Sequence, residues 1–143
     1  SSPSSPSSPS ASTSYRALAD QYFALFGQDG DRPDKGDRGP EYRSLVGLPG
    51  GVTGALFPQL KAAANARGVG LALLEGRGAD GDTSGKKIVW VMDSDTYPFR
   101  QGEIYHQFHD GFMPGEQYPD SYNKMARAAV ARGAAGPTGC PDI

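Results

Sequence analysis

The chain has 143 residues and a formal net charge of −2, with acidic and basic residues interspersed along its length. No basic stripe runs along it that could neutralise a row of phosphates, so nucleic acid is not an expected partner. The longest apolar runs, "LALL" and "IVWVM", are far too short to cross a bilayer, so we expect a soluble protein with no membrane partner, in the cytoplasm or in an organelle that the sequence does not specify.

Two stretches of low complexity flank the part of the chain that can pack. Residues 1–14, "SSPSSPSSPSASTS", contain no large apolar side chain, and we interpret them as a disordered linker. Residues 133–143, "GAAGPTGCPDI", are rich in glycine and proline and are interpreted as a flexible tail that carries Cys140, the only cysteine. A domain over residues 15–132 remains, which is long enough to bury a core.

The first part of this domain is predicted to run from a helix through a loop into a strand. In "YRALADQYFALF", residues 15–26, apolar side chains recur at helical spacing, and Ser14 is placed to cap the start. Residues 27–40 form a long polar loop, and loops of this length without structure of their own are often functional. "EYRSLVG", residues 41–47, follows as a short strand.

The middle of the domain is predicted to contain one helix and two strands. "TGALFPQLKAAANARG", residues 53–68, has helical spacing, and Pro58 is most comfortable near its first turn. "GLALLEG", residues 70–76, and "KKIVWVMDS", residues 86–94, are the two strand candidates. A segment rich in glycine and aspartate separates them.

Two further helices are predicted after the last strand, over residues 99–112 and 118–133. Asp120 or Ser121 is placed to cap the second of these helices, and Gly133 to end it. The whole order of elements indicates an α+β domain in which a small mixed sheet is flanked by helices.

A first candidate for chemistry is the segment "EIYHQFHD". Glu103, His106 and His109 recur there every three residues, which brings them near one face of a helix and could suggest a metal site. The strong zinc signature instead places its histidines four residues apart, and histidines held in ordinary hydrogen bonds are commoner. We therefore assign no metal.

The other candidates are the loop "GDRGPEYRS" and the tail cysteine. A tyrosine hydroxyl is neutral near pH 7, so Tyr42 could polarise an oxygen as a donor, and Asp37 could orient that hydroxyl or a water. Asp37 could equally fix the loop through its own backbone, and composition alone favours that structural role. Cys140 is either incidental or a mobile thiol, and without further context the incidental reading is favoured.

These segments occur in the order found in one protein family. "FALFGQDGDRPDKGDRGPEYRS" resembles the stretch of A-type methionine sulfoxide reductases that runs from an apolar helix through Asp-Pro to Arg-Gln-Gly-x-Asp-x-Gly-x-Gln-Tyr-Arg-Ser. "FRQGEIYHQF" resembles the family's aromatic-x-x-Ala-Glu-x-Tyr-His-Gln segment, and "GAAGPTGCPDI" is similar to the tails that carry its recycling cysteine. The residues at the family spacing are Asp37, Gly39, Tyr42, Arg43, Ser44, Glu103, Tyr105, His106 and Gln107, with Glu41 in place of Gln and Gly102 in place of Ala.

This resemblance implies a peptide-methionine (S)-S-oxide reductase with the ferredoxin-like fold of that family, which repairs oxidised methionine in peptides or proteins. In the family a thiolate attacks the sulfoxide sulfur, methionine leaves, and a tail cysteine converts the sulfenic acid to a disulfide that thioredoxin reduces. By position, Tyr42 would donate to the sulfoxide oxygen, Asp37 would support the pocket and hold substrate, and Cys140 would be the resolving cysteine. The residues implied to be structural near the site are Glu103, Tyr105, His106 and Gln107. No bound cofactor is implied, and thioredoxin or another dithiol would be the reductant.

The chain departs from the family at the nucleophile. The family's attacking cysteine lies in a Gly-Cys-Phe-Trp motif near the start of its domain, whereas Cys140 is the only cysteine here and Trp90 lies in the strand candidate "IVWVM". The resemblance covers the C-terminal two-thirds of the family domain, so we expect an incomplete fold and a fragment, or a chain inactive alone. Two alternatives stay open, a non-catalytic domain that binds methionine or its sulfoxide, and a small interaction domain whose tail cysteine pairs with a partner.

Overall fold

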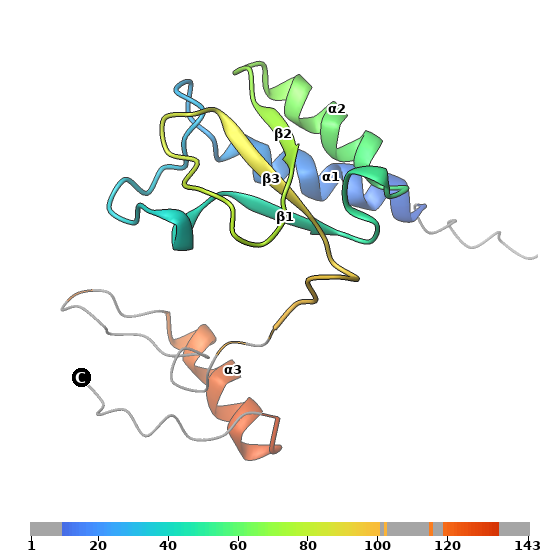
Figure 1. Cartoon of the computed structure of the whole chain (residues 1–143). Coiled ribbons are helices and arrows are strands. Elements are labelled where there is room, and N and C mark those ends of the chain that lie inside the picture. Colours follow the sequence, from blue (N-terminus) through green and yellow to red (C-terminus); the bar gives the residue numbers. More distant parts are fainter. Residues whose placement is uncertain (1–9, 101, 103–114, 116–118, 135–143) are drawn as a thin grey trace, which may run out of the picture. The chain divides into compact units, whose positions relative to one another are not determined.

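A computed structural model of the chain describes residues 10–100, 102, 115 and 119–134 (Figure 1). The chain divides into two compact units, Ser1–Phe99 and Arg100–Ile143, and each is described by itself. Among these described residues, the first unit contains two α-helices and a three-stranded sheet, and the second contains one α-helix. The α+β class predicted from the sequence agrees with this content.

Helix α1, Ala11–Ala24, begins four residues earlier than predicted. Ser10, not Ser14, is the N-cap residue, and its hydroxyl accepts a hydrogen bond from the Thr13 amide at 3.2 Å. Such a cap satisfies one of the amides that the first turn leaves without a partner. Residues 11–14, which we interpreted as the end of a disordered linker, are therefore helical.

Helix α2, Phe57–Arg67, lies beside α1 and packs against it. Pro58 lies in its first turn as predicted, where its missing amide costs no hydrogen bond. The helix ends at Gly68, whose φ of 75° lies in the left-handed region that favours glycine. The Arg67 guanidinium then joins the two helices by donating to the Phe26 carbonyl oxygen at 2.6 and 3.0 Å.

Three short strands form the sheet: β1 (Leu45–Leu48), β2 (Ala72–Glu75) and β3 (Ile88–Asp93). Their order is β1-β3-β2, and both strand pairs are parallel. In the described part of the chain the sheet is therefore parallel and not mixed as predicted. The segment between β2 and β3 carries the chain back across the sheet before β3 begins, so β3 enters in the same direction as its neighbours. The A-type reductase arrangement stays an untested expectation.

The core lies between the sheet and the two helices. Val89 and Val91 of β3 are fully buried and belong to one apolar cluster with Leu60 of α2 and Phe23 and Phe26 of α1. The last two rings lie with their centroids 5.8 Å apart. Burying side chains of this size is the main source of stability in a small domain.

The segment that joins β2 to β3 is held to the strands by hydrogen bonds. The Trp90 indole nitrogen donates to the Gly81 carbonyl oxygen at 2.9 Å, and the Arg43 guanidinium donates to the Gly78 carbonyl oxygen at 3.0 Å. Trp90 is the only tryptophan in the chain, so its fluorescence reports on this segment. The segment is thus a fixed part of the first unit.

In the second unit, helix α3 spans Asp120–Ala131. Its N-cap residue is Pro119, and no side chain caps it, so the prediction of Asp120 or Ser121 as the cap is wrong. Gly133 follows the helix with a φ of 74°. Most of the helix predicted over residues 99–112 lies outside the described residues. No helix in the described part of the chain is long and apolar enough to span a membrane.

Candidate functional site

The polar loop between α1 and β1 is built on its own aspartates. The Asp29 carboxylate accepts from the Asp31 amide at 3.0 Å, and the Asp34 carboxylate accepts from the Gly36 amide at 2.9 Å. These are Asx turns, in which a short acidic side chain replaces a backbone partner. The hydrogen bonds lower the pKa of both carboxyls, with the Lys35 bond first for Asp29 and the Gly36 amide first for Asp34. The loop therefore has a defined conformation.

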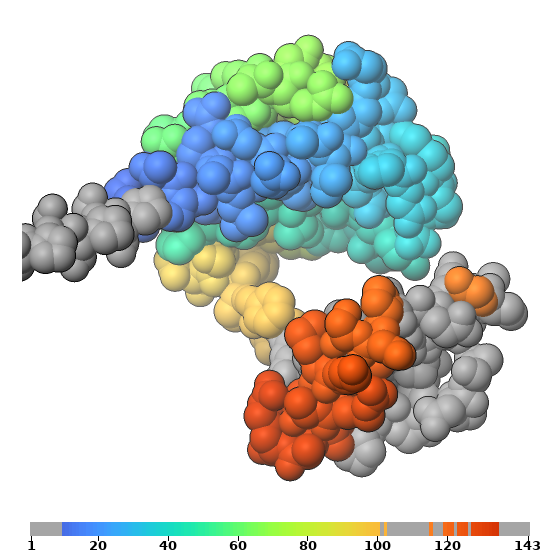
Figure 2. All heavy atoms as spheres, turned by 180° about the vertical axis from the view of Figure 1, so that it is seen from behind, coloured from blue at the N-terminus to red at the C-terminus, as the bar shows by residue number. Residues whose placement is uncertain are grey.

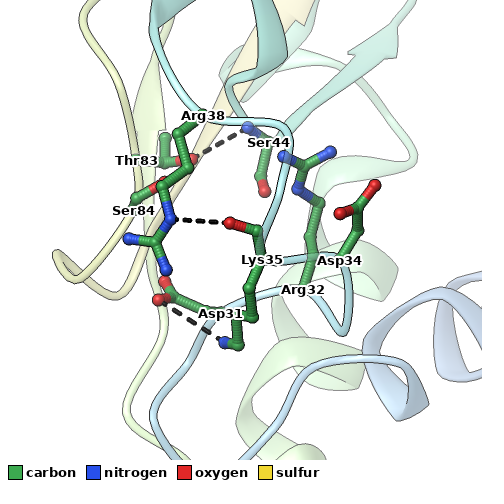
Figure 3. Close-up of a pocket in the computed structure, with 8 residues that line it drawn as sticks. All are labelled: Asp31, Arg32, Asp34, Lys35, Arg38, Ser44, Thr83 and Ser84. Carbon is green, nitrogen blue, oxygen red and sulfur yellow. Dashed lines mark hydrogen bonds and ion pairs between the residues drawn. The ribbon is translucent and has the colours of Figure 1, made fainter.

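One hydrogen bond joins this loop to the segment before β3, and two ion pairs lie within the loop. The Asp31 carboxylate accepts from the Gly85 amide at 2.8 Å, across 54 residues of sequence. Lys35 Nζ lies 2.8 Å from the Asp29 carboxylate. It lies 3.8 Å from the Asp31 carboxylate (Figure 3). Exposed ion pairs stabilise little on their own, so we assign most of the fastening to the Asp31–Gly85 bond.

Tyr42 ends a short 3₁₀ turn, η1 (Pro40–Tyr42), immediately before β1. Gly39 precedes the turn with a φ of 116°, a conformation that favours glycine. Tyr42 is 42% exposed, and its hydroxyl has no hydrogen-bond partner among the described residues. The turn therefore presents at the surface a phenol that no other described residue binds.

Asp37 is also exposed, but it is not joined to Tyr42. Its amide donates to the Asp34 carboxylate at 3.4 Å, and its carbonyl oxygen accepts from the Arg32 guanidinium at 2.9 Å. No hydrogen bond links the Asp37 carboxylate to the Tyr42 hydroxyl in the part of the chain described. The five-residue spacing thus places both groups on one loop without bringing them together.

A small cavity lies inside the loop (Figure 3). The residues that line it are Asp31, Arg32, Asp34, Lys35, Arg38, Ser44, Thr83 and Ser84. Its volume is about 10 Å³, which is about the space that one water molecule needs. Neither Asp37 nor Tyr42 lines it, so it is not a substrate pocket.

Arg43 fixes the position of the neighbouring Tyr42. Its guanidinium donates to the Pro40 carbonyl oxygen at 2.6 Å and to that of Gly78 at 3.0 Å, so it ties η1 to the segment after β2. The Nε atom of Arg43 is buried and has no hydrogen-bond partner among the residues that the structure describes. A planar guanidinium with two fixed bonds leaves the turn little freedom.

Two buried hydroxyl residues, Ser44 and Thr83, lie beside the loop, and sequence reasoning did not predict their contact. The Ser44 amide donates to Thr83 Oγ1 at 2.9 Å, and both residues are buried. Burial raises the pKa of Tyr22 to about 12, although the Arg32 charge and a hydrogen bond with Ser44 act to lower it. Ser44 belongs to the segment that resembles the reductase family. Thr83 lies in a glycine-rich stretch in which no sequence pattern predicts a buried hydroxyl.

A second hollow, of about 280 Å³, lies at the carboxyl ends of the strands, the edge where parallel sheets commonly bind ligands. Asp93, at the end of β3, lines it, and its carboxylate accepts from the amides of Asp95 at 2.9 Å and Gly50 at 3.0 Å. These bonds, the Asp95 amide first, lower the pKa of Asp93. The Asp93 carboxylate is therefore already hydrogen-bonded to the backbone of two adjoining turns. Tyr42 does not line this hollow.

The remaining predicted site residues lie outside the described part of the chain. They are Cys140, Glu103, Tyr105, His106 and Gln107, and His109 from the metal hypothesis lies there too. Among the residues that are described, no three acidic, histidine or cysteine side chains gather closely enough to hold a metal ion.

Comparison with known proteins identifies no relative of this chain. No protein-family model, curated protein or solved structure matches this chain.

Proposed function

We propose that this chain supplies the oxygen-holding part of a site for methionine sulfoxide. The observation that carries the proposal is Tyr42, a 42% exposed residue whose hydroxyl has no hydrogen-bond partner in the described part of the chain. It lies on a turn that the Arg43 guanidinium bonds to Pro40 and to Gly78. A neutral phenol in a fixed position can donate a hydrogen bond to a sulfoxide oxygen without first breaking a bond of its own. The resemblance of "GDRGPEYRS" to the reductase segment supports the same role.

Asp37 is proposed to act from the same loop on the bound substrate. Its carboxylate is exposed, and the Arg32 and Asp34 contacts hold its backbone in place. It can hold a water or a peptide amide beside the sulfoxide, which is the supporting role that the resemblance implies. It acts on substrate directly, because it does not touch Tyr42.

Reduction of a sulfoxide consumes two thiols, and this chain has one cysteine. The first thiolate forms a bond to sulfur, the oxygen passes to that thiol as a sulfenic acid, and methionine leaves. The second thiol then displaces water to form a disulfide. Cys140 is proposed as the second thiol, so the first must come from outside these 143 residues, from a protein segment or from an added dithiol. The chain alone is expected to be inactive.

The single cysteine also favours the second candidate, a non-catalytic domain that binds methionine sulfoxide. Both candidates need the same donor at Tyr42, and they differ only in whether a thiol reaches the bound sulfur. An activity assay with a nucleophile-bearing partner or dithiothreitol separates them, and a binding assay tests what they share.

The binding test uses a peptide with one (S)-methionine sulfoxide and its unoxidised form. We expect the full chain to bind the sulfoxide more tightly, and Tyr42→Phe to reduce that preference by about two- to tenfold, the value of one neutral hydrogen bond. Tyr97→Phe is the matched control, because Tyr97 is 41% exposed but its hydroxyl already donates to the Arg77 carbonyl oxygen. Equal binding of both peptides, or equal loss in both variants, would contradict the proposal.

A further inference from the structure

The segment between β2 and β3 contains a tight turn, residues 77–80, that one carboxylate closes. Asp80 Oδ1 accepts from the Arg77 amide at 2.9 Å, and Oδ2 accepts from the amides of Arg77 and Gly78, each at 3.0 Å. A short acidic side chain that binds two nearby backbone amides fixes the local path of the chain. The Asp80 side chain therefore sets the direction in which the peptide groups of this turn point.

The turn over residues 77–80 presents the Gly78 carbonyl oxygen to the residue that follows Tyr42. The Arg43 guanidinium donates to that oxygen at 3.0 Å and to the Pro40 carbonyl oxygen at 2.6 Å. Pro40 begins η1 and Tyr42 ends it. The bond from Arg43 to Gly78 spans 35 residues of sequence, so the position of η1 depends on where the distant turn holds this oxygen.

Position 78 requires a glycine for this arrangement. The φ of Gly78 is 103°, in the region that favours glycine, and a Cβ placed there would lie 3.0 Å from the Tyr97 ring. The bond from the Gly78 amide to Asp80 holds the peptide in this conformation. Backbone conformation and side-chain contact therefore both direct the Gly78 carbonyl oxygen toward Arg43.

We propose that Asp80 is a positioning residue for Tyr42, and this inference rests on the function proposed above. Through Gly78 and Arg43, Asp80 holds η1 where the Tyr42 hydroxyl meets the sulfoxide oxygen. The polar loop that leads to η1 lies at the surface of the first unit, in light blue to cyan in Figure 2. A hydrogen bond weakens steeply when its donor is out of line, so a turn without this anchor binds the sulfoxide less well.

The quantity that tests the proposal is the sulfoxide preference, which is the dissociation constant of the unoxidised peptide divided by that of the (S)-sulfoxide peptide, measured with the full chain. Asp80→Ala should lower this preference by about two- to fivefold, part of the value of one neutral hydrogen bond. Asp80→Glu keeps the charge, but its longer side chain does not close the same turn, so it should lower the preference similarly.

Asp80→Asn separates the geometry of the turn from the charge of the carboxylate. Asparagine has no charge but keeps one oxygen with the same reach, and the Oδ2 position alone accepts from both amides. Its sulfoxide preference should therefore stay within about twofold of that of the wild type.

The same substitution in a Tyr42→Phe chain shows whether Asp80 acts through the Tyr42 hydroxyl. Asp80→Ala should lower the preference of the wild type but leave that of Tyr42→Phe unchanged, a coupling that a general loss of stability does not produce. Tyr97→Phe is a control, because it removes an exposed bond to the Arg77 carbonyl oxygen but keeps the three Asp80 bonds. Circular dichroism shows that each variant is folded.

The outcomes separate this inference from the proposed function. A wild-type chain without a sulfoxide preference, or with one that Tyr42→Phe leaves intact, overturns both. A preference that depends on Tyr42 but is unchanged in Asp80→Ala and Asp80→Glu overturns the role of Asp80 alone. An equal loss with and without the Tyr42 hydroxyl also overturns that role, as does an Asp80→Asn variant that behaves like Asp80→Ala.

Discussion

Replacing Thr83 by valine tests the contact that holds the β2–β3 segment against the start of β1. Valine keeps the shape of threonine but removes the hydroxyl that accepts from the Ser44 amide at 2.9 Å. Both residues are about 6% exposed, so water does not readily replace the lost acceptor. A buried amide left without a partner costs about 1–3 kcal/mol. This is a large part of the roughly 5–15 kcal/mol that stabilises a typical domain.

The assay is urea unfolding at neutral pH, followed by the fluorescence of Trp90, which is bonded to the same segment at Gly81. With a slope of about 1–3 kcal/mol per molar urea, the midpoint should fall by about 1 M in Thr83→Val. Thr83→Ser keeps the hydroxyl and should stay within about 1 kcal/mol of the wild type. If the two variants unfold at the same midpoint, the hydroxyl does not hold the segment, and the reasoning fails.

Two further predictions concern the core and the strand ends. Leu60→Ala should destabilise the first unit by about 2–5 kcal/mol, because the Leu60 side chain is almost completely buried. Leu74→Ala, on the exposed edge strand β2, should destabilise it far less. Equal shifts of the urea midpoint in the two variants would contradict the assigned core. Because the folded pKa of Asp93 is lowered, its contribution to stability is present above the ordinary aspartate pKa and is lost as the pH falls through the folded value. In Asp93→Asn the free energy of unfolding, measured from urea midpoints, should therefore decrease less between about pH 5 and pH 2 than in the wild type. An unchanged pH dependence would show that other carboxyl groups cause the loss of stability in acid.

The strands were the part of the fold most readily predicted from the sequence. The apolar runs over residues 70–76 and 86–94 contain β2 and β3, and the predicted strand over 41–47 overlaps β1. The direction of pairing was predicted incorrectly, as a mixed sheet, because a run such as "IVWVM" fits a parallel or an antiparallel neighbour equally well. The path of the chain between strands decides the direction, and it depends on contacts such as that of Gly78 with Arg43.

The candidate site was predictable in its residues but not in its geometry. The spacing of Asp37 and Tyr42 indicated one polar loop, and both residues do lie on it, yet no hydrogen bond joins their side chains in the described part of the chain. Thr83 escaped notice because its role depends on a residue 39 positions away in sequence. The cap of α1 was misplaced because Ser10 and Ser14 are equivalent in sequence terms, and only the Ser10–Thr13 bond distinguishes them.

The strand order has a consequence for how the chain is synthesised. Of the three described strands β3 is the last to leave the ribosome, yet both earlier strands pair with it, Leu45 with Trp90 and Ala72 with Ile88. Until Ile88–Asp93 has emerged, β1 and β2 have no hydrogen-bonded neighbour in this sheet. Nascent chains that stop before this point should stay protease-sensitive, and the sheet should assemble late and in one step.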